Sequence, residues 1–170
     1  MPDDRVLEVR SATTQDVDAV VRVTVRAYAN ERGWVSDSAV VTGERTSADQ
    51  VRAMIDVPRS VILVAERYGA VVASCHVQAE GAEIAHLGML AVDPGWQARG
   101  FSRLLRTAAC DYARDVLDCA CVEIEVLSTH EDLRRMYERD GFTATGETRA
   151  FPPHAARVAG LCFVVLRKRL

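Results

Sequence analysis

A change of hydrophobic period between residues 85 and 106 constrains the fold of this chain more than any other feature. The segment, AHLGMLAVDPGWQARGFSRLLR, opens with an apolar run over residues 87–92 that has the length of a buried strand. Asp93-Pro94-Gly95 ends the strand, because proline has no N–H for the ladder and glycine admits left-handed geometry. After Gly100 the apolar residues follow one face of a helix: Phe101, Leu104, Leu105, Ala108 and Tyr112. The segment therefore predicts a strand, a turn and a helix.

The turn over residues 97–102 lies at the start of the predicted helix. A helix N-terminus carries unpaired N–H groups and the positive end of the helix dipole, so it attracts anions. Gly100 lets the backbone approach a bulky anion, and Gln97 and Arg99 add hydrogen-bond donors. This pattern favours a diphosphate-binding turn, with a plain strand–helix turn as the alternative.

Periodicity elsewhere predicts an α/β fold with one mixed sheet in the order βααβββαβαββ, built by a single domain of residues 1–170. Short links predict an antiparallel meander, and the strand–helix–strand unit that starts at residue 87 predicts a parallel pair with a right-handed crossover. Helix caps are expected at residues 13–16, 47–50 and 128–132, and a helix stop at Gly141. Residues 30–46 are expected to form a loop or a broken helix. The expected strands cover residues 6–10, 60–66, 70–78, 87–92, 121–127, 142–147 and 161–166.

Two motifs resemble signatures of the GNAT N-acetyltransferase superfamily. Residues 92–102 read V-x-P-x-x-Q-x-R-G-x-S and resemble motif A, in which a Q/R-x-x-G-x-G/A loop holds the diphosphate of acetyl-CoA. Residues 136–142, MYERDGF, resemble the signature l-Y-e-r-x-G-F. Three positions depart from the family pattern: Ser102 replaces glycine or alanine, His130 replaces an asparagine, and Leu133 replaces a small residue. The two motifs occur in the family's order on the expected elements, which favours the resemblance over coincidence.

The resemblance implies a GNAT fold whose sheet splays between the fourth and fifth strands, with acetyl-CoA (coenzyme A) in the gap. By position, the pantetheine arm would pair with the backbone of the central strand, an edge-pairing mode of recognition. The alternative is that these strand residues belong only to the core. The cofactor-binding residues that the resemblance implies are Leu90, Ala91, Val92, Gln97, Ala98, Arg99, Gly100, Phe101, Ser102 and His130.

The implied reaction needs an acid and a base. Tyr137 matches the family tyrosine that protonates the leaving sulfur; the alternative is a core tyrosine at helical spacing from Leu133. Candidates for the base are His86 and Glu83 near the central strand, then Glu123 and Glu125, and a chain of water molecules is a further alternative. The amine pocket is expected between two loops, which hold Tyr28, Glu31, Trp34, Asp37 and Glu44 and residues 151–154.

Composition excludes several other classes of protein. The net charge of −3 argues against nonspecific nucleic-acid binding, and no apolar run has membrane-spanning length. The first residues lack the pattern of a signal peptide, so a cytoplasmic location is expected. The five cysteines contain no C-x-x-C pair and the histidines no zinc-ligand spacing, so no metal is expected.

The sequence therefore predicts an acetyl-CoA-dependent N-acetyltransferase that acts on a primary amine of a small molecule or peptide. The first alternative is a CoA-binding module of the same fold without turnover, which the departures at Ser102, His130 and Leu133 would suit. The second is an interaction domain that binds no CoA. A homodimer formed through the last strands is an open alternative.

Overall fold

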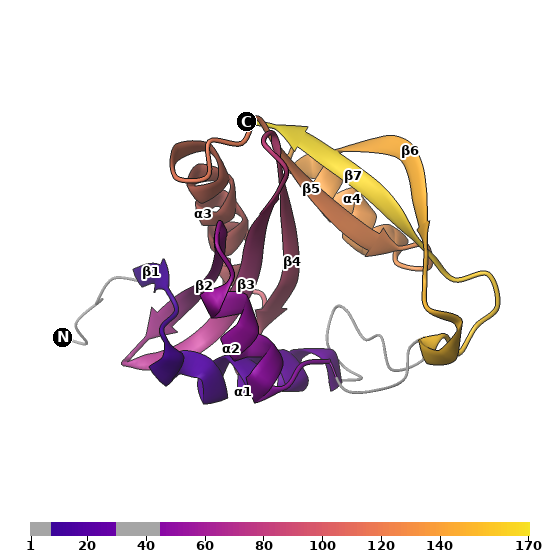
Figure 1. Cartoon of the computed structure of the whole chain (residues 1–170). Coiled ribbons are helices and arrows are strands. Elements are labelled where there is room, and N and C mark those ends of the chain that lie inside the picture. The colour runs from indigo at the N-terminus through magenta and orange to yellow at the C-terminus, as the bar shows by residue number, and fades with distance from the viewer. Residues whose placement is uncertain (1–7, 30–44) are drawn as a thin grey trace.

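A mixed sheet with the strand order β1-β2-β3-β4-β5-β7-β6 runs through the computed structural model, which describes residues 8–29 and 45–170 (Figure 1). The order of helices and strands predicted from the sequence is confirmed. The strands are β1 Glu8–Ser11, β2 Ser60–Arg67, β3 Ala70–Glu80, β4 Ile84–Val92, β5 Cys121–Leu127, β6 Thr143–Ala150 and β7 Cys162–Arg169. The helices are α1 Val17–Ala29, α2 Ala48–Asp56, α3 Phe101–Asp115 and α4 Glu131–Arg139, with 3-10 turns at Thr14–Asp16, Pro94–Trp96 and Pro153–Ala155.

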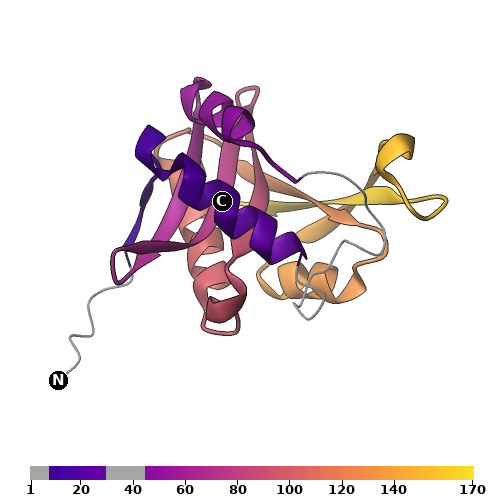
Figure 2. The same ribbon diagram turned by 90° about the horizontal axis from the view of Figure 1, so that it is seen from below.

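The helices cover the sheet from two sides. α1 and α2 lie over one face of β2–β4, where Val20 and Val51 pack with Ile62 and Val64 (Figure 2). α3 and α4 lie on the opposite face, where Leu105 joins a cluster with Leu63 and Ile124. The face of β5-β7-β6 that lies opposite α4 carries no helix within residues 8–29 and 45–170.

Helix ends follow the local sequence. Capping boxes at Thr13 and Ser47 precede α1 and α2, as expected. α4 ends in a Schellman motif, because the Phe142 N–H donates to the Tyr137 carbonyl (3.1 Å) and the Gly141 N–H to the Glu138 carbonyl (3.1 Å). The start of α4 differs from expectation: His130 occupies the N-cap position but makes no side-chain capping bond. The last two strands extend beyond the expected residues, to Ala150 and Arg169.

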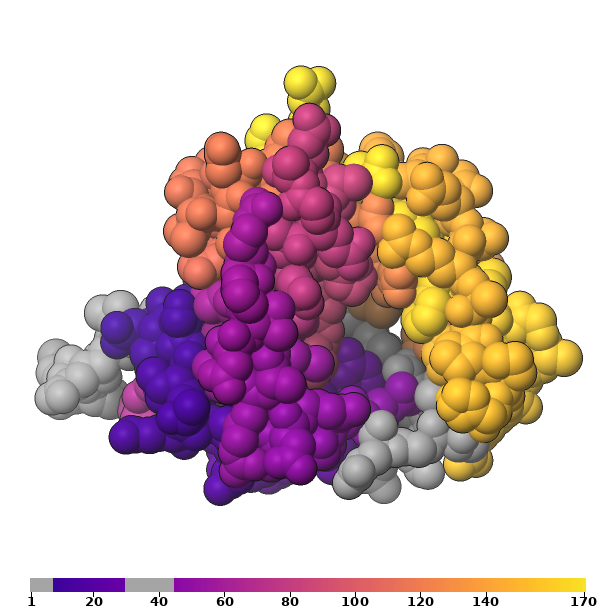
Figure 3. Space-filling model, viewed as in Figure 1, coloured from indigo at the N-terminus to yellow at the C-terminus, as the bar shows by residue number. Residues whose placement is uncertain are grey.

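The predicted splay between the fourth and fifth strands is confirmed. β4 pairs with β5 only from Ile84 to His86, opposite Cys121 to Glu123. Its register with β3 then shifts, so that both Met89 and Leu90 lie opposite Cys75, and Met89 takes a left-handed φ of 52°. This bulge bends β4 away from β5, and the two halves of the sheet diverge (Figures 1 and 3).

Of the helices in the described ranges, none combines the length and apolarity that crossing a bilayer requires.

Candidate active site

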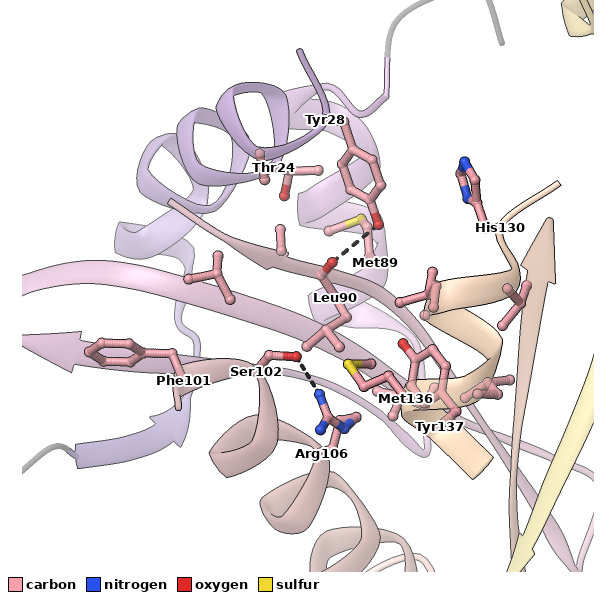
Figure 4. Close-up of a pocket in the computed structure, with 18 of the residues that line it drawn as sticks. Thr24, Tyr28, Met89, Leu90, Phe101, Ser102, Arg106, His130, Met136 and Tyr137 are labelled. Carbon is pink, nitrogen blue, oxygen red and sulfur yellow. Dashed lines mark hydrogen bonds between the residues drawn. The ribbon is translucent and has the colours of Figure 1, made fainter. Parts of the chain in front are cut away.

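A cleft of about 1030 Å³ opens where the two halves of the sheet part (Figures 3 and 4). Its walls come from α1, the second half of β4, the turn after β4, the first turns of α3, β5 and α4, together with Arg45, Phe151 and Phe163. All of the cofactor-binding residues predicted from the sequence line this cleft except Arg99. The volume is at the upper end of the range for small-molecule sites, which suits a long ligand.

The turn before α3 is shaped to receive a group from the cleft. Gly100 is the N-cap residue of α3, with a left-handed φ of 86°, and Ala98 is also left-handed at 59°. A side chain on Gly100 would meet no heavy atom within 4 Å, so the space beside it is open. In the first hydrogen bond of α3 the Leu104 N–H donates to the Gly100 carbonyl. The N–H groups of residues 101–103 therefore have no carbonyl partner in the helix. The turn thus presents donors to the cleft at the positive end of a helix.

Side chains around this turn hold its shape. The Gln97 amide donates to the Val92 carbonyl (3.2 Å), which ties the turn to the end of β4. The Arg99 guanidinium stacks over the Trp96 ring at 5.0 Å from the centroid, and Trp96 meets Phe101 edge-on at 5.7 Å. Arg99 is therefore directed along the surface of the turn and is not part of the cleft lining.

The bulged part of β4 leaves an unpaired strand edge in the cleft. From Leu87 to Val92 the strand has no β5 partner, although both strands continue. Tyr28 of α1 donates its hydroxyl to the Leu90 carbonyl (3.2 Å), which fixes the bulge from one side (Figure 4). Backbone groups at Leu90, Ala91 and Val92 are therefore next to the place where an extended ligand could add as a strand.

Tyr137 approaches the same bulge from α4 (Figure 4). Its side chain is 7 % exposed and meets the Phe142 ring edge-on at 5.6 Å. Burial raises the pKa of the Tyr137 phenol well above its usual range, the neighbouring Tyr28 raises that pKa further, and Arg106 opposes both. The phenol is therefore protonated at neutral pH and can act as a hydrogen-bond or proton donor.

The structure separates the candidate bases. Glu83 lies in the exposed turn before β4, where its carbonyl accepts the N–H groups of Ala120 and Cys121. His86 lies at the point where β4 still pairs with β5. Neither residue lines the cleft, whereas Glu125 of β5 does and is paired with Arg149 at 2.5 Å.

Glu123 is held inside an ion cluster. Its side chain is 1 % exposed and accepts hydrogen bonds from Arg149 (2.5 Å) and Arg167 (2.6 Å). Burial alone would raise the pKa of Glu123, but the hydrogen bonds from Arg167 and Arg149 outweigh it and lower that pKa. Glu123 is therefore an ionised structural carboxylate, which makes it a poor proton acceptor.

Replacing Glu123 with glutamine should lower the free energy of unfolding at pH 7 by about 2 kcal/mol, because two arginines lose a buried ionised partner. The carboxylate of Glu123 has a lowered pKa in the folded state, so its contribution is present above the ordinary glutamate range and is lost as the pH falls. The difference between wild type and Glu123→Gln should therefore shrink below about pH 4. Urea denaturation at pH 7 and below about pH 4 measures this difference in the free energy of unfolding. Glu125→Gln, whose carboxylate shares Arg149, is the milder control. A difference independent of pH would contradict this assignment.

The residues expected to form the amine pocket are only partly gathered at the cleft. Tyr28 and Phe151 line it as expected, and Phe151 packs on Phe163 with ring centroids 5.2 Å apart. Residues 152–154 are exposed and do not line the cleft. The other expected pocket residues, Glu31, Trp34, Asp37 and Glu44, lie outside the described part of the chain.

Thr24 of α1 adds to the cleft lining a polar group that was not expected from the sequence. Its hydroxyl is buried, lines the cleft and has no hydrogen-bond partner among residues 8–29 and 45–170. Replacing Thr24 with valine, which has nearly the same shape, should raise the free energy of unfolding by about 1 kcal/mol, because the unpaired hydroxyl is removed. Thermal or urea denaturation checks this. Thr13→Val, which removes a hydroxyl that accepts the Gln15 N–H, should instead destabilise, and a loss of stability in Thr24→Val would show that the hydroxyl is bonded.

Arg106 is the main cleft residue that sequence reasoning missed. The helical face of α3 is shifted from the expected one: Leu105, Ala109 and Ala113 are fully buried, whereas Leu104, Ala108 and Tyr112 are only partly buried. Arg106 is 5 % exposed on this face and donates to Ser102, one helical turn before it. That spacing of four residues was the available signal.

Comparisons with known proteins agree with this geometry. A family model described as "Acetyltransferase (GNAT) family" matches residues 29–142. No curated protein sequence matches the chain significantly.

Several solved structures have the same fold at low sequence identity. The ribosomal-protein-alanine N-acetyltransferase of Brucella melitensis has a TM-score of 0.75 and 20 % identity, over 96 % of this chain and 100 % of that one. The ribosomal-protein-S18-alanine N-acetyltransferase of Escherichia coli has a TM-score of 0.72 and 18 % identity, over 96 % and 94 %. The PaiA N-acetyltransferase of Thermoplasma acidophilum, solved in complex with coenzyme A, has a TM-score of 0.72 and 12 % identity, over 97 % and 99 %.

Proposed function

This chain belongs to the GNAT acetyltransferase family, and from that membership and the geometry of its cleft we propose that it is an N-acetyltransferase. The proposed reaction transfers the acetyl group of acetyl-CoA to a primary amine of a small molecule or peptide. One observation carries the proposal: the donor-rich turn before α3, the unpaired edge of β4 and the protonated Tyr137 all face one cleft.

The residues present fit acetyl-CoA. The open space at Gly100 and the N–H groups of residues 101–103 can receive a diphosphate, and the edge of β4 from Leu90 to Val92 can pair with an amide-containing arm. The solved relative from Thermoplasma acidophilum was crystallised with coenzyme A, which supports the same ligand here. Acetyl-CoA would supply an acyl group activated as a thioester.

The chain's own groups would divide the chemical work. A backbone N–H near Leu90 would stabilise negative charge on the acyl oxygen, and the Tyr28 bond to the Leu90 carbonyl would keep that part of the backbone in place. Tyr137 would donate its proton to the departing sulfur. Glu125 would orient the cationic amine, and water in the open cleft would accept the amine's proton. His86 and Glu83 remain alternatives for that last role, at positions outside the cleft lining.

Two measurements on the 170-residue chain test the proposal. Acetyl-CoA should raise the melting temperature, and a panel of amines should include some that trigger release of free CoA thiol. The panel should cover peptides with an N-terminal alanine, polyamines, amino acids and arylalkylamines. Stabilisation without thiol release from any amine would favour a CoA-binding module without turnover. The absence of any thermal shift would favour an interaction domain that binds no CoA.

A further inference from the structure

A buried cation connects the turn before α3, where the diphosphate is proposed to bind, with α4, the helix that carries Tyr137. The Arg106 guanidinium donates to the Ser102 hydroxyl at the start of α3 and to the Asp140 carboxylate at the end of α4, the latter at 2.5 Å. Its Cζ atom lies 5.7 Å from the centroid of the Tyr137 ring. Figure 4 shows Arg106 reaching from α3 toward Met136 and Tyr137 at the floor of the cleft.

The charge of Arg106 is only partly cancelled by its partner. The Arg106 side chain is 6 % exposed, whereas the Asp140 side chain is 24 % exposed and thus better screened by solvent. Within the part of the chain that the structure describes, the groups that act on the pKa of Tyr137 are Tyr28 from α1, Cys75 from β3, Arg106 from α3 and Asp140. A second cation, the Lys168 ammonium, lies 5.8 Å from the centroid of the Phe142 ring. Arg106 is the cation among the groups that face Tyr137, and its effect on the pKa of Tyr137 exceeds the opposite effect of Asp140.

We infer that Arg106 is a positioning residue for proton transfer, whose guanidinium, held by Ser102 and Asp140, stabilises the negative charge left on Tyr137 after it donates its proton. This inference rests on the proposed function. In the step, the O–H bond of Tyr137 breaks and an S–H bond forms on the leaving thiolate. The phenolate then regains, through water, the proton that the attacking amine released. A buried phenolate without a nearby cation would be costly, so Arg106 lowers the cost of the intermediate state.

The arrangement also explains the departure at Ser102. A glycine or alanine at this position has no hydroxyl for the guanidinium, whereas Ser102 accepts from Arg106 and helps to fix its direction. The serine hydroxyl is thus turned along α3 toward Arg106. Ser102 can therefore serve the turn through its backbone N–H while its side chain serves Arg106.

The first test measures the acidity of position 137 without any acceptor amine. A polyfluorinated tyrosine placed at position 137 of the 170-residue chain titrates at a lower pH than tyrosine and reports its ionisation by fluorine NMR. Arg106→Met should raise its titration midpoint by about one pH unit, and Asp140→Asn, which keeps the guanidinium but removes the opposing charge, should lower it. Arg106→Lys keeps the positive charge and should stay near wild type.

Arg106→Met and Asp140→Asn should shift the titration midpoint in opposite directions, which separates the inference from a general loss of structure. Loosened packing would move both midpoints in one direction, and that result, or no movement, would overturn the inference. The variants' melting temperatures and their dissociation constants for CoA, measured by calorimetry, show whether the fold and the cofactor site persist. If Arg106→Met does not fold, the other two variants still test the inference: the midpoint should fall in Asp140→Asn and stay near wild type in Arg106→Lys.

The second test uses an acceptor found in the amine panel. Arg106→Met should lower kcat about tenfold with little change in KM for acetyl-CoA, and it should have no further effect in a Tyr137→Phe background. An equal loss in both backgrounds would overturn the inference. Failure of the proposed function would look different: no amine in the panel would release CoA thiol, while the NMR titration would still report on Arg106.

Discussion

Replacing Gly100 with valine should weaken acetyl-CoA binding by at least about 100-fold, the largest change in affinity expected from any single substitution in this chain. The backbone of Gly100 is left-handed, with φ at 86°, and the space beside it is open. A valine there would project its branched side chain into the space proposed for the diphosphate. It would also strain the N-cap of α3, whose N–H groups supply the donors.

A second glycine separates the loss of the site from the strain of a left-handed valine. Gly146 in β6 has nearly the same φ, 85°, also has open space around it, and does not line the cleft. Gly146→Val should cost a similar amount of stability, about 1–2 kcal/mol, while the dissociation constant for acetyl-CoA stays at the wild-type value. Calorimetry and urea denaturation of both variants provide the comparison. Tight acetyl-CoA binding by a folded Gly100→Val protein would remove the turn from the proposed site.

Most of the fold could be predicted because its determinants are local. The change from strand to helix period around Gly100, the capping boxes at Thr13 and Ser47, and the glycine stop at Gly141 each act within a few residues. The order of elements was therefore predictable, and the resemblance to the GNAT superfamily added the splay of the sheet. The start of α4 was less predictable, because His130 makes no capping bond that a sequence rule could anticipate.

The arrangement of side chains in the cleft depended on contacts between distant segments. The bulge at Met89 and Leu90 inserts one extra residue, so the strand alternation before it does not predict which side chains face the cleft after it. His86 and Glu83 precede this bulge and lie outside the cleft lining. Burial of Glu123 requires arginines from two other strands, β6 and β7, and burial of Arg106 requires Asp140 from the end of α4. No local pattern reports such partners.

Tyr137→Phe should lower kcat for acetyl transfer by about 100-fold and leave the dissociation constant for acetyl-CoA unchanged. The substitution removes only the hydroxyl, and the ring keeps its place against Phe142. Because burial and Tyr28 hold the pKa of the phenol well above its usual range, Tyr137 stays protonated across the pH range of ordinary assays. Its loss should therefore lower kcat by a similar factor throughout that range. Stopped assays of CoA thiol release at several pH values measure this.

A matched tyrosine tests whether the effect belongs to the cleft. Tyr112 of α3 is half-buried, unlike the buried Tyr137, and does not line the cleft, so Tyr112→Phe should leave kcat and acetyl-CoA binding at their wild-type values. If Tyr137→Phe instead weakened acetyl-CoA binding with kcat unchanged, the hydroxyl would act in binding the cofactor. If neither quantity changed, Tyr137 would be a core residue, and the leaving sulfur would have to take its proton from water. Only a loss confined to kcat would identify Tyr137 as the acid, and only then would Arg106 have a phenolate charge to stabilise.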